Sequence, residues 1–89
     1  MPLRPSVTDM YHKVAQLRVQ QKLKERLEKR GKHAFISTHE IYGIVAEEFK
    51  ELGDALQAND REAFVSELVD ICVGALHGIA SHYSGALEW

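Results

Sequence analysis

Cysteine is almost absent from this 89-residue sequence, since Cys72 is the only one. A lone cysteine excludes the disulfide framework on which many small secreted domains depend, and it favours a reducing, cytoplasmic location. Because Cys72 lies in an apolar run, we expect a small buried hydrophobic residue and not a reactive thiol. The opening Met-Pro-Leu-Arg-Pro stretch contains no apolar segment, so no signal peptide is predicted.

Long apolar runs, internal prolines and strand-like alternation are also missing. The longest weakly charged stretch, residues 68–80, is interrupted by Asp70 and His77. We therefore expect it to be too short and too polar to span a bilayer, and no membrane partner is predicted. Proline is confined to positions 2 and 5, and no segment alternates apolar and polar residues as a half-buried strand does. These absences indicate a helical protein.

Periodicity and end signals predict helices over residues of about 7–30, 38–57 and 60–82. Ser37 and Glu40 form a capping-box pattern, in which the Glu40 carboxylate is expected to reach back to the Ser37 amide. Asn59 and Asp60 provide a second capping pattern before the third helix. The sequence therefore predicts an all-α fold, with one three-helix domain over residues 1–89.

The first predicted helix is apolar on two sides. Met10, Val14 and Leu17 share one face, whereas Leu23 and Leu27 belong to another. A helix with two apolar sides usually has two neighbours, and the chain supplies few candidates. A chain of this size also buries a small fraction of its surface when it folds alone. We therefore expect an oligomeric helical bundle in which a second copy covers the remaining apolar side.

Positive and negative charges are separated along the chain. Residues 1–32 carry nine Lys and Arg against three acids, whereas residues 33–89 carry two against ten. A basic run such as residues 22–30 is found in nucleic-acid-binding helices, but its interspersed acids and lack of aromatic residues are more typical of a solvated face. A third possibility is that the basic half faces the acidic half or the phosphates of a ligand. Nucleic acid is not the expected partner.

Carboxylates occupy positions where burial is expected. Glu48 falls in the middle of the apolar stripe of the second helix, and Glu51 lies one turn further at its edge. In the third helix, Glu67 and Asp70 begin a polar lane that continues through His77. A carboxylate at a core-facing position is costly unless it is protonated, paired or bound to a metal ion.

Two explanations of these acids remain open from spacing alone. Four convergent carboxylates without His or Cys favour a hard cation, Mg²⁺ or Mn²⁺, over Zn²⁺. A di-iron bundle is disfavoured because it would require Glu-x-x-His on two helices. The competing explanation is a set of buried ion pairs with basic side chains of the first helix, for which the candidates are Arg18, Lys22 and Lys24.

A family resemblance lies in the same residues. Glu47-Glu48-Phe49-Lys50-Glu51, a spacer of fifteen residues and Glu67-Leu-Val-Asp70 resemble the EExxE…ExxD signature of the MazG-like nucleoside triphosphate pyrophosphohydrolases. The match covers about half of the chain, over residues 37–80. The run from Ser37 to Gly43 is similar to that of small integron-associated members of the family.

The resemblance implies an all-α homodimer or dimer of dimers that cleaves an NTP or dNTP to the monophosphate and pyrophosphate, as a house-cleaning enzyme of the nucleotide pool. It implies Mg²⁺ as cofactor, with Mn²⁺ as a possible substitute. The implied metal ligands are Glu48, Glu51, Glu67 and Asp70. Glu47 is implied as an additional catalytic acid, a candidate for binding a second metal ion or for orienting the attacking water. The rivals are a phosphoribosyl-ATP pyrophosphohydrolase, and a catalytically silent homo-oligomeric module that binds a nucleotide or a protein.

Candidate substrate contacts lie outside these motifs. Longer family members carry Lys and Arg for the phosphates after the second motif, but here no Lys or Arg follows Asp70. Phosphate contacts are then expected from His77, from the region between the first two helices, at Arg30, Lys32 and His33, or from a partner subunit. His77 is equally compatible with a structural hydrogen bond. His12 and Gln16 are candidates for reading a nucleobase, although a plain polar face is the more ordinary explanation.

Overall fold

The computed structural model describes residues 3–89, and it contains three helices and no strand in that range. They are α1 (Asp9–Arg30), α2 (Thr38–Gln57) and α3 (Arg61–Tyr83). The predicted all-α, three-helix fold is confirmed. The helix ends differ from the predicted ones by at most two residues, because the end signals are local and the chain obeys them.

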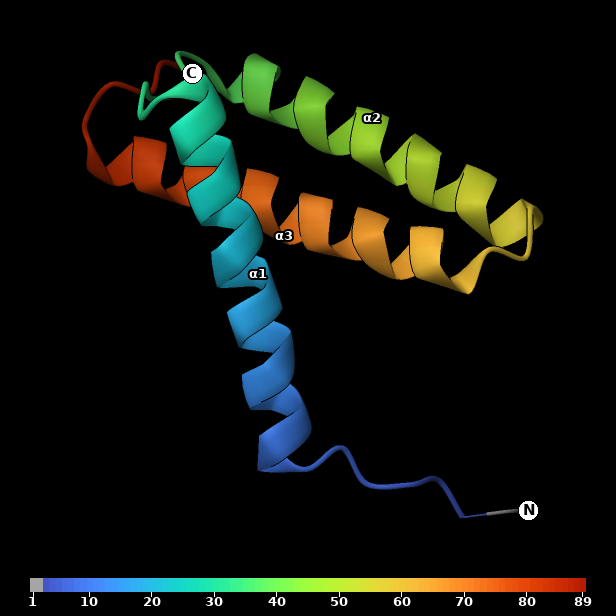
Figure 1. Cartoon of the computed structure of the whole chain (residues 1–89). Helices are drawn as coiled ribbons and strands as arrows, with labels where there is room; N and C mark the ends of the chain where they lie inside the picture. The colour runs from blue at the N-terminus through green and yellow to red at the C-terminus, as the bar shows by residue number, and fades with distance from the viewer. Residues whose placement is uncertain (1–2) are drawn as a thin grey trace.

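The helices α2 and α3 form an antiparallel hairpin, and α1 crosses α3 at a steep angle (Figure 1). The first half of α1 extends away from the hairpin, so α1 contains no buried residue. Four apolar side chains are buried among the described residues: Phe35, Ala55, Val69 and Val73. The core of a single chain is therefore a narrow seam between α2 and α3, closed by the loop that follows α1.

Side-chain caps define the hairpin ends. The Ser37 hydroxyl accepts a hydrogen bond from the Glu40 amide at 3.1 Å, as a capping box requires. The prediction for the return bond was wrong by one residue, because the Glu40 carboxylate accepts from the Ile36 amide at 2.9 Å. Extended pairing of Ser37 with Glu88 brings the end of the chain beside this cap. At the other end, the Asp60 carboxylate caps α3 by accepting from the Ala63 amide.

One long face of α3 is exposed in the single chain. Cys72 belongs to this face, so the prediction that it is buried was wrong. The physical reason is that α2 and α1 cover only the other side of α3, which leaves Leu68, Leu76 and Ile79 between 41% and 57% exposed. Residues 68–80 were expected to be too short and too polar to span a bilayer, yet the whole of α3 is long and apolar enough to do so by length and composition. The core helices of soluble proteins pass the same test.

Candidate metal centre and facing basic groove

Three carboxylates from two helices converge between α2 and α3. Glu48 comes from α2, and Glu67 and Asp70 come from α3. One oxygen of each lies within 4.8 Å of the others. Residues three apart on a helix project from the same side, which explains why Glu67 and Asp70 reach the same place. Glu48 joins them because it occupies the middle of the α2 stripe that packs on α3.

Two oxygens of the cluster are buried without a partner. Among the described residues, no hydrogen-bond donor reaches Glu48 Oε2 or Glu67 Oε2. A buried carboxylate oxygen that is left unsatisfied destabilises the folded state by roughly 1–3 kcal/mol or more. A bound cation or proton would therefore stabilise the cluster. Its ligand atoms are all carboxylate oxygens, which fit a divalent cation such as Mg²⁺.

The pKa of Glu48 shows that the protonated form of this carboxyl is favoured. It is raised from an ordinary value of 4.5 to about 7. Burial of the carboxyl is the main cause, followed by the adjoining Glu67 carboxyl and by repulsion from Asp70 and Glu51. Without a cation, Glu48 is expected to keep its proton up to about pH 7, because burial and the neighbouring acids both disfavour its charged form.

The other two acids of the first motif lie outside the cluster. Glu51 is one turn beyond Glu48 and exposed, yet near enough for its charge to raise the pKa of Glu48. Glu47 is also exposed, on the neighbouring position of α2. The structure thus gathers three of the four expected metal ligands, and it leaves Glu51 at the rim.

Ion pairing with α1 satisfies only part of the cluster. Within residues 3–89 one ion pair is present, between Lys22 Nζ and Asp70 Oδ1 at 4.0 Å. Both side chains are partly exposed, and pairs of this kind contribute little to stability. Neither Glu48 nor Glu67 has such a partner in the described part of the chain. Of the other predicted partners, Arg18 lines a hollow beside Asp70, whereas Lys24 is exposed away from it.

A groove of about 320 Å³ opens onto the cluster from the side of α1. Glu48 and Asp70 form its acidic wall. Its other wall comes from α1, whose lining residues are Lys22, Glu25, Arg26, Lys29 and Arg30. Sequence reasoning noted the charge of this helix but missed Arg26 and Lys29. The signal that would have found them is their i, i+4 and i+7 spacing from Lys22, which places all of them on one helical face.

Of the predicted phosphate contacts, Arg30 lines this groove. The other predicted substrate contacts lie elsewhere. His77 Nε2 is 2.8 Å from the His33 carbonyl oxygen, and its ring packs edge-on against Phe35. This histidine joins α3 to the loop before α2. His12 and Gln16 are exposed in the part of α1 that extends from the hairpin, and Lys32 is exposed in the loop after α1.

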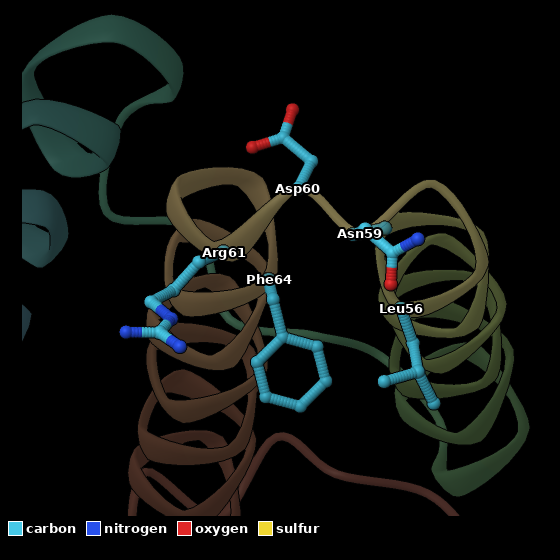
Figure 2. Close-up of a pocket in the computed structure, with 6 residues that line it drawn as sticks. Leu56, Asn59, Asp60, Arg61 and Phe64 are labelled. Carbon is cyan, nitrogen blue, oxygen red and sulfur yellow. The ribbon is translucent and has the colours of Figure 1, made fainter.

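A second hollow, of about 360 Å³, lies at the turn between α2 and α3. Figure 2 shows Leu56 and Phe64 projecting from the two helices to form its apolar floor, while the Asp60 carboxylate points away from it. One oxygen of the Asp60 carboxylate is engaged in capping α3. The hollow lacks a converging set of polar groups of the kind that orients a ligand.

Comparisons of this chain with protein-family models, with curated proteins and with solved structures give no match.

Proposed function

We propose that this chain is a Mg²⁺-dependent nucleoside triphosphate pyrophosphohydrolase of the MazG-like kind. It cleaves an NTP or dNTP to the monophosphate and pyrophosphate, and it removes unwanted nucleotides from the cytoplasmic pool. The observation that carries the proposal is the carboxylate cluster of Glu48, Glu67 and Asp70, with two buried oxygens that have no partner among the described residues.

The cofactor follows from the ligand chemistry. Glu48, Glu67 and Asp70 would hold Mg²⁺, with Glu51 at the rim completing the set, and Mn²⁺ would substitute because it accepts the same oxygens. When bound, the cation neutralises phosphate charge and favours ionisation of water. Glu47, exposed at the position before Glu48, is the candidate for orienting the attacking water or for binding a second metal ion.

A triphosphate is the substrate class that suits this site. Phosphoryl chemistry depends more on positioning and charge neutralisation than on a protein nucleophile. The cluster offers no thiol or hydroxyl for covalent catalysis, since its members are all carboxylates. The groove beside it is large enough to admit a chain of phosphates, and both signs of charge line it.

The active form is a homodimer or a dimer of dimers. A compact monomer of 10.1 kDa exposes about 5,300 Å², whereas this chain exposes 7579 Å². The excess of roughly 2,300 Å² is comparable with the surface that obligate homodimers bury. Its apolar part lies on α1, at Met10, Val14 and Leu17, and on the exposed face of α3. We favour protein over lipid as the cover, because α3 carries Glu67 and Asp70 and burying them in hydrocarbon is costly.

The test is pyrophosphate release from a panel of NTPs and dNTPs, with and without Mg²⁺. Wild type is expected to release pyrophosphate only with the metal, and Glu48→Gln and Asp70→Asn are expected to lose at least about 100-fold in kcat/KM, as loss of a metal ligand implies. Asp54→Asn, an exposed acid on the same helix as Glu48, is the matched control and should retain activity.

Circular dichroism checks that each variant stays helical. Failure of the folded wild type to release pyrophosphate from any nucleotide, with Mg²⁺ or Mn²⁺, would exclude the enzyme. A nucleotide-binding module without catalysis would then remain, and it would show metal-dependent nucleotide binding without turnover.

A further inference from the structure

We infer that the groove-lining face of α1, formed by Lys22, Arg26, Lys29 and Arg30, binds the phosphate groups of the substrate opposite the carboxylate cluster. The inference rests on the proposed function, and it assigns the source of the cations that a polyphosphate needs at this site. The ligand class is an inorganic or nucleoside polyphosphate that bridges a divalent cation on one wall and basic side chains on the other.

The placement of the residues carries the inference. Four basic side chains of α1 line the groove that Glu48 and Asp70 line from the hairpin. They are spaced at 22, 26, 29 and 30, so they follow one stripe of the helix for about two turns. The stripe starts at the cluster itself, because Lys22 Nζ is 4.0 Å from Asp70 Oδ1. A phosphate chain that begins at the metal would therefore run along these cations.

Among residues 3–89, no basic residue outside α1 lines this groove. Lys50 and Arg61 are the only basic residues after position 32 apart from histidines. Neither lines the groove, and Arg61 belongs to the hollow at the turn. Within one chain, the basic side chains that can neutralise the phosphates in this groove therefore come from α1.

Two contacts shape the basic wall. The Arg26 guanidinium lies 5.2 Å from the centre of the Phe35 ring, a cation–π contact that fixes the direction of its side chain. The acid in the wall, Glu25, is within weak hydrogen-bonding distance of Gln21, at 3.4 Å. Four cations against one acid leave this wall positive, which favours anions.

The ion pair of Lys22 with Asp70 also affects metal binding. While Lys22 pairs with Asp70 it occupies one side of the cluster. A cation that takes Asp70 as a ligand weakens this attraction, because the carboxylate charge is then shared with the metal. With a cation bound to Asp70, Lys22 would be free to contact a phosphate oxygen, so binding of the metal and binding of the polyphosphate are expected to strengthen each other.

The experiment measures binding of inorganic pyrophosphate by calorimetry in the presence of Mg²⁺, and binding of Mn²⁺ alone by electron paramagnetic resonance. The test protein is Lys29→Gln/Arg30→Gln, which removes two exposed cations of the groove. The matched control is Lys13→Gln/Lys24→Gln, which removes the same charge from exposed positions of α1 outside the groove.

We expect Mn²⁺ to bind wild type and both double variants alike, and pyrophosphate affinity to fall about tenfold or more in Lys29→Gln/Arg30→Gln alone. If all three proteins bind Mn²⁺ and pyrophosphate equally, the assignment of the phosphates to α1 is overturned while the metal site stands. If wild type binds no Mn²⁺, the proposed function fails together with the inference. Pyrophosphate binding that needs no metal and persists in Glu48→Gln would also overturn the inference.

Discussion

At the scale of single residues, burial of Glu48 makes the stability of the fold depend on pH and on bound cations. Its pKa is raised to about 7, so between pH 4.5 and 7 the folded chain holds a proton that the unfolded chain has released. The free energy of unfolding therefore falls as pH rises through this window. The contribution of Glu48 to the free energy of unfolding is fully present below pH 4.5 and is lost above pH 7. After a discount for the partial exposure of the side chain, we expect the free energy of unfolding to fall by about 2 kcal/mol across this window.

Urea unfolding of metal-free protein at pH 5 and pH 7.5 measures this difference. Glu48→Gln should remove most of the loss, since glutamine does not ionise, whereas Glu62→Gln, at an exposed site of α3, should keep it. Saturating Mg²⁺ at pH 7.5 should restore stability to wild type, because the metal takes the place of the proton. Equal stability of metal-free wild type at both pH values would show that Glu48 titrates normally.

At the scale of the helices, two glycines of α3 lie against α2, so adding a methyl group at each one tests how closely the two helices pack. A Cβ atom at Gly74 would meet Ile44 Cγ2 at 3.7 Å, an ordinary contact, whereas one at Gly78 would meet Ile41 Cγ2 at 3.1 Å. Alanine is favoured over glycine inside a helix by about 1 kcal/mol. Gly74→Ala should therefore raise the free energy of unfolding by up to about 1 kcal/mol, while overpacking cancels or reverses this gain in Gly78→Ala.

Thermal unfolding of both variants at one protein concentration checks this order. Gly74→Ala should unfold at a higher temperature than wild type, and Gly78→Ala should unfold below Gly74→Ala. The same order would not be found if α2 and α3 packed with another register, because Ile41 would then face a different residue. A Gly78→Ala variant that is as stable as Gly74→Ala would contradict the close approach seen here.

Helix boundaries were predictable because the signals are local. Asp60 caps the helix that it precedes, and Ser37 does the same for α2. The return bond of the α2 cap was misplaced, since the Glu40 carboxylate bonds Ile36 while the end of the chain pairs with Ser37. That pairing joins segments about fifty residues apart, and no local pattern indicates it.

The candidate site was predictable only in part, for a similar reason. Helical periodicity placed Glu48 on the core side of α2 and aligned Glu67 with Asp70, which was enough to bring these three together. Periodicity also placed Glu51 at the edge of the stripe, which agrees with its exposed position at the rim. The angle at which α1 crosses α3 decides that Arg26 and Lys29 face the cluster, and this angle depends on tertiary packing.

At the scale of the whole molecule, the single chain exposes more surface, and more apolar surface, than a compact monomer of its size would. Its radius of gyration is 15.2 Å, whereas a compact domain of this length has a value near 12 Å. We expect light scattering to give a mass at least twice 10.1 kDa. Leu68→Glu/Leu76→Glu should shift the mass to that of a monomer, because it places charge on the exposed face of α3.

Gln57→Glu adds a charge at an exposed position of α2 and is the control, with an unchanged mass. Circular dichroism separates dissociation from unfolding. A monomeric wild type at micromolar concentration, or a double variant with the mass of wild type, would show that the α3 face is not the interface.

The pairing of Ser37 with Glu88 also gives the protein an optical reporter. Trp89 is the one tryptophan of the sequence, it directly follows the paired residue, and it is 96% exposed. The anisotropy of its fluorescence therefore reports whether the C-terminal segment is anchored to the start of α2, because a released segment moves more freely. A quencher such as iodide reaches it freely in the single chain, so protection from quenching would reveal a neighbouring copy at that end of the hairpin.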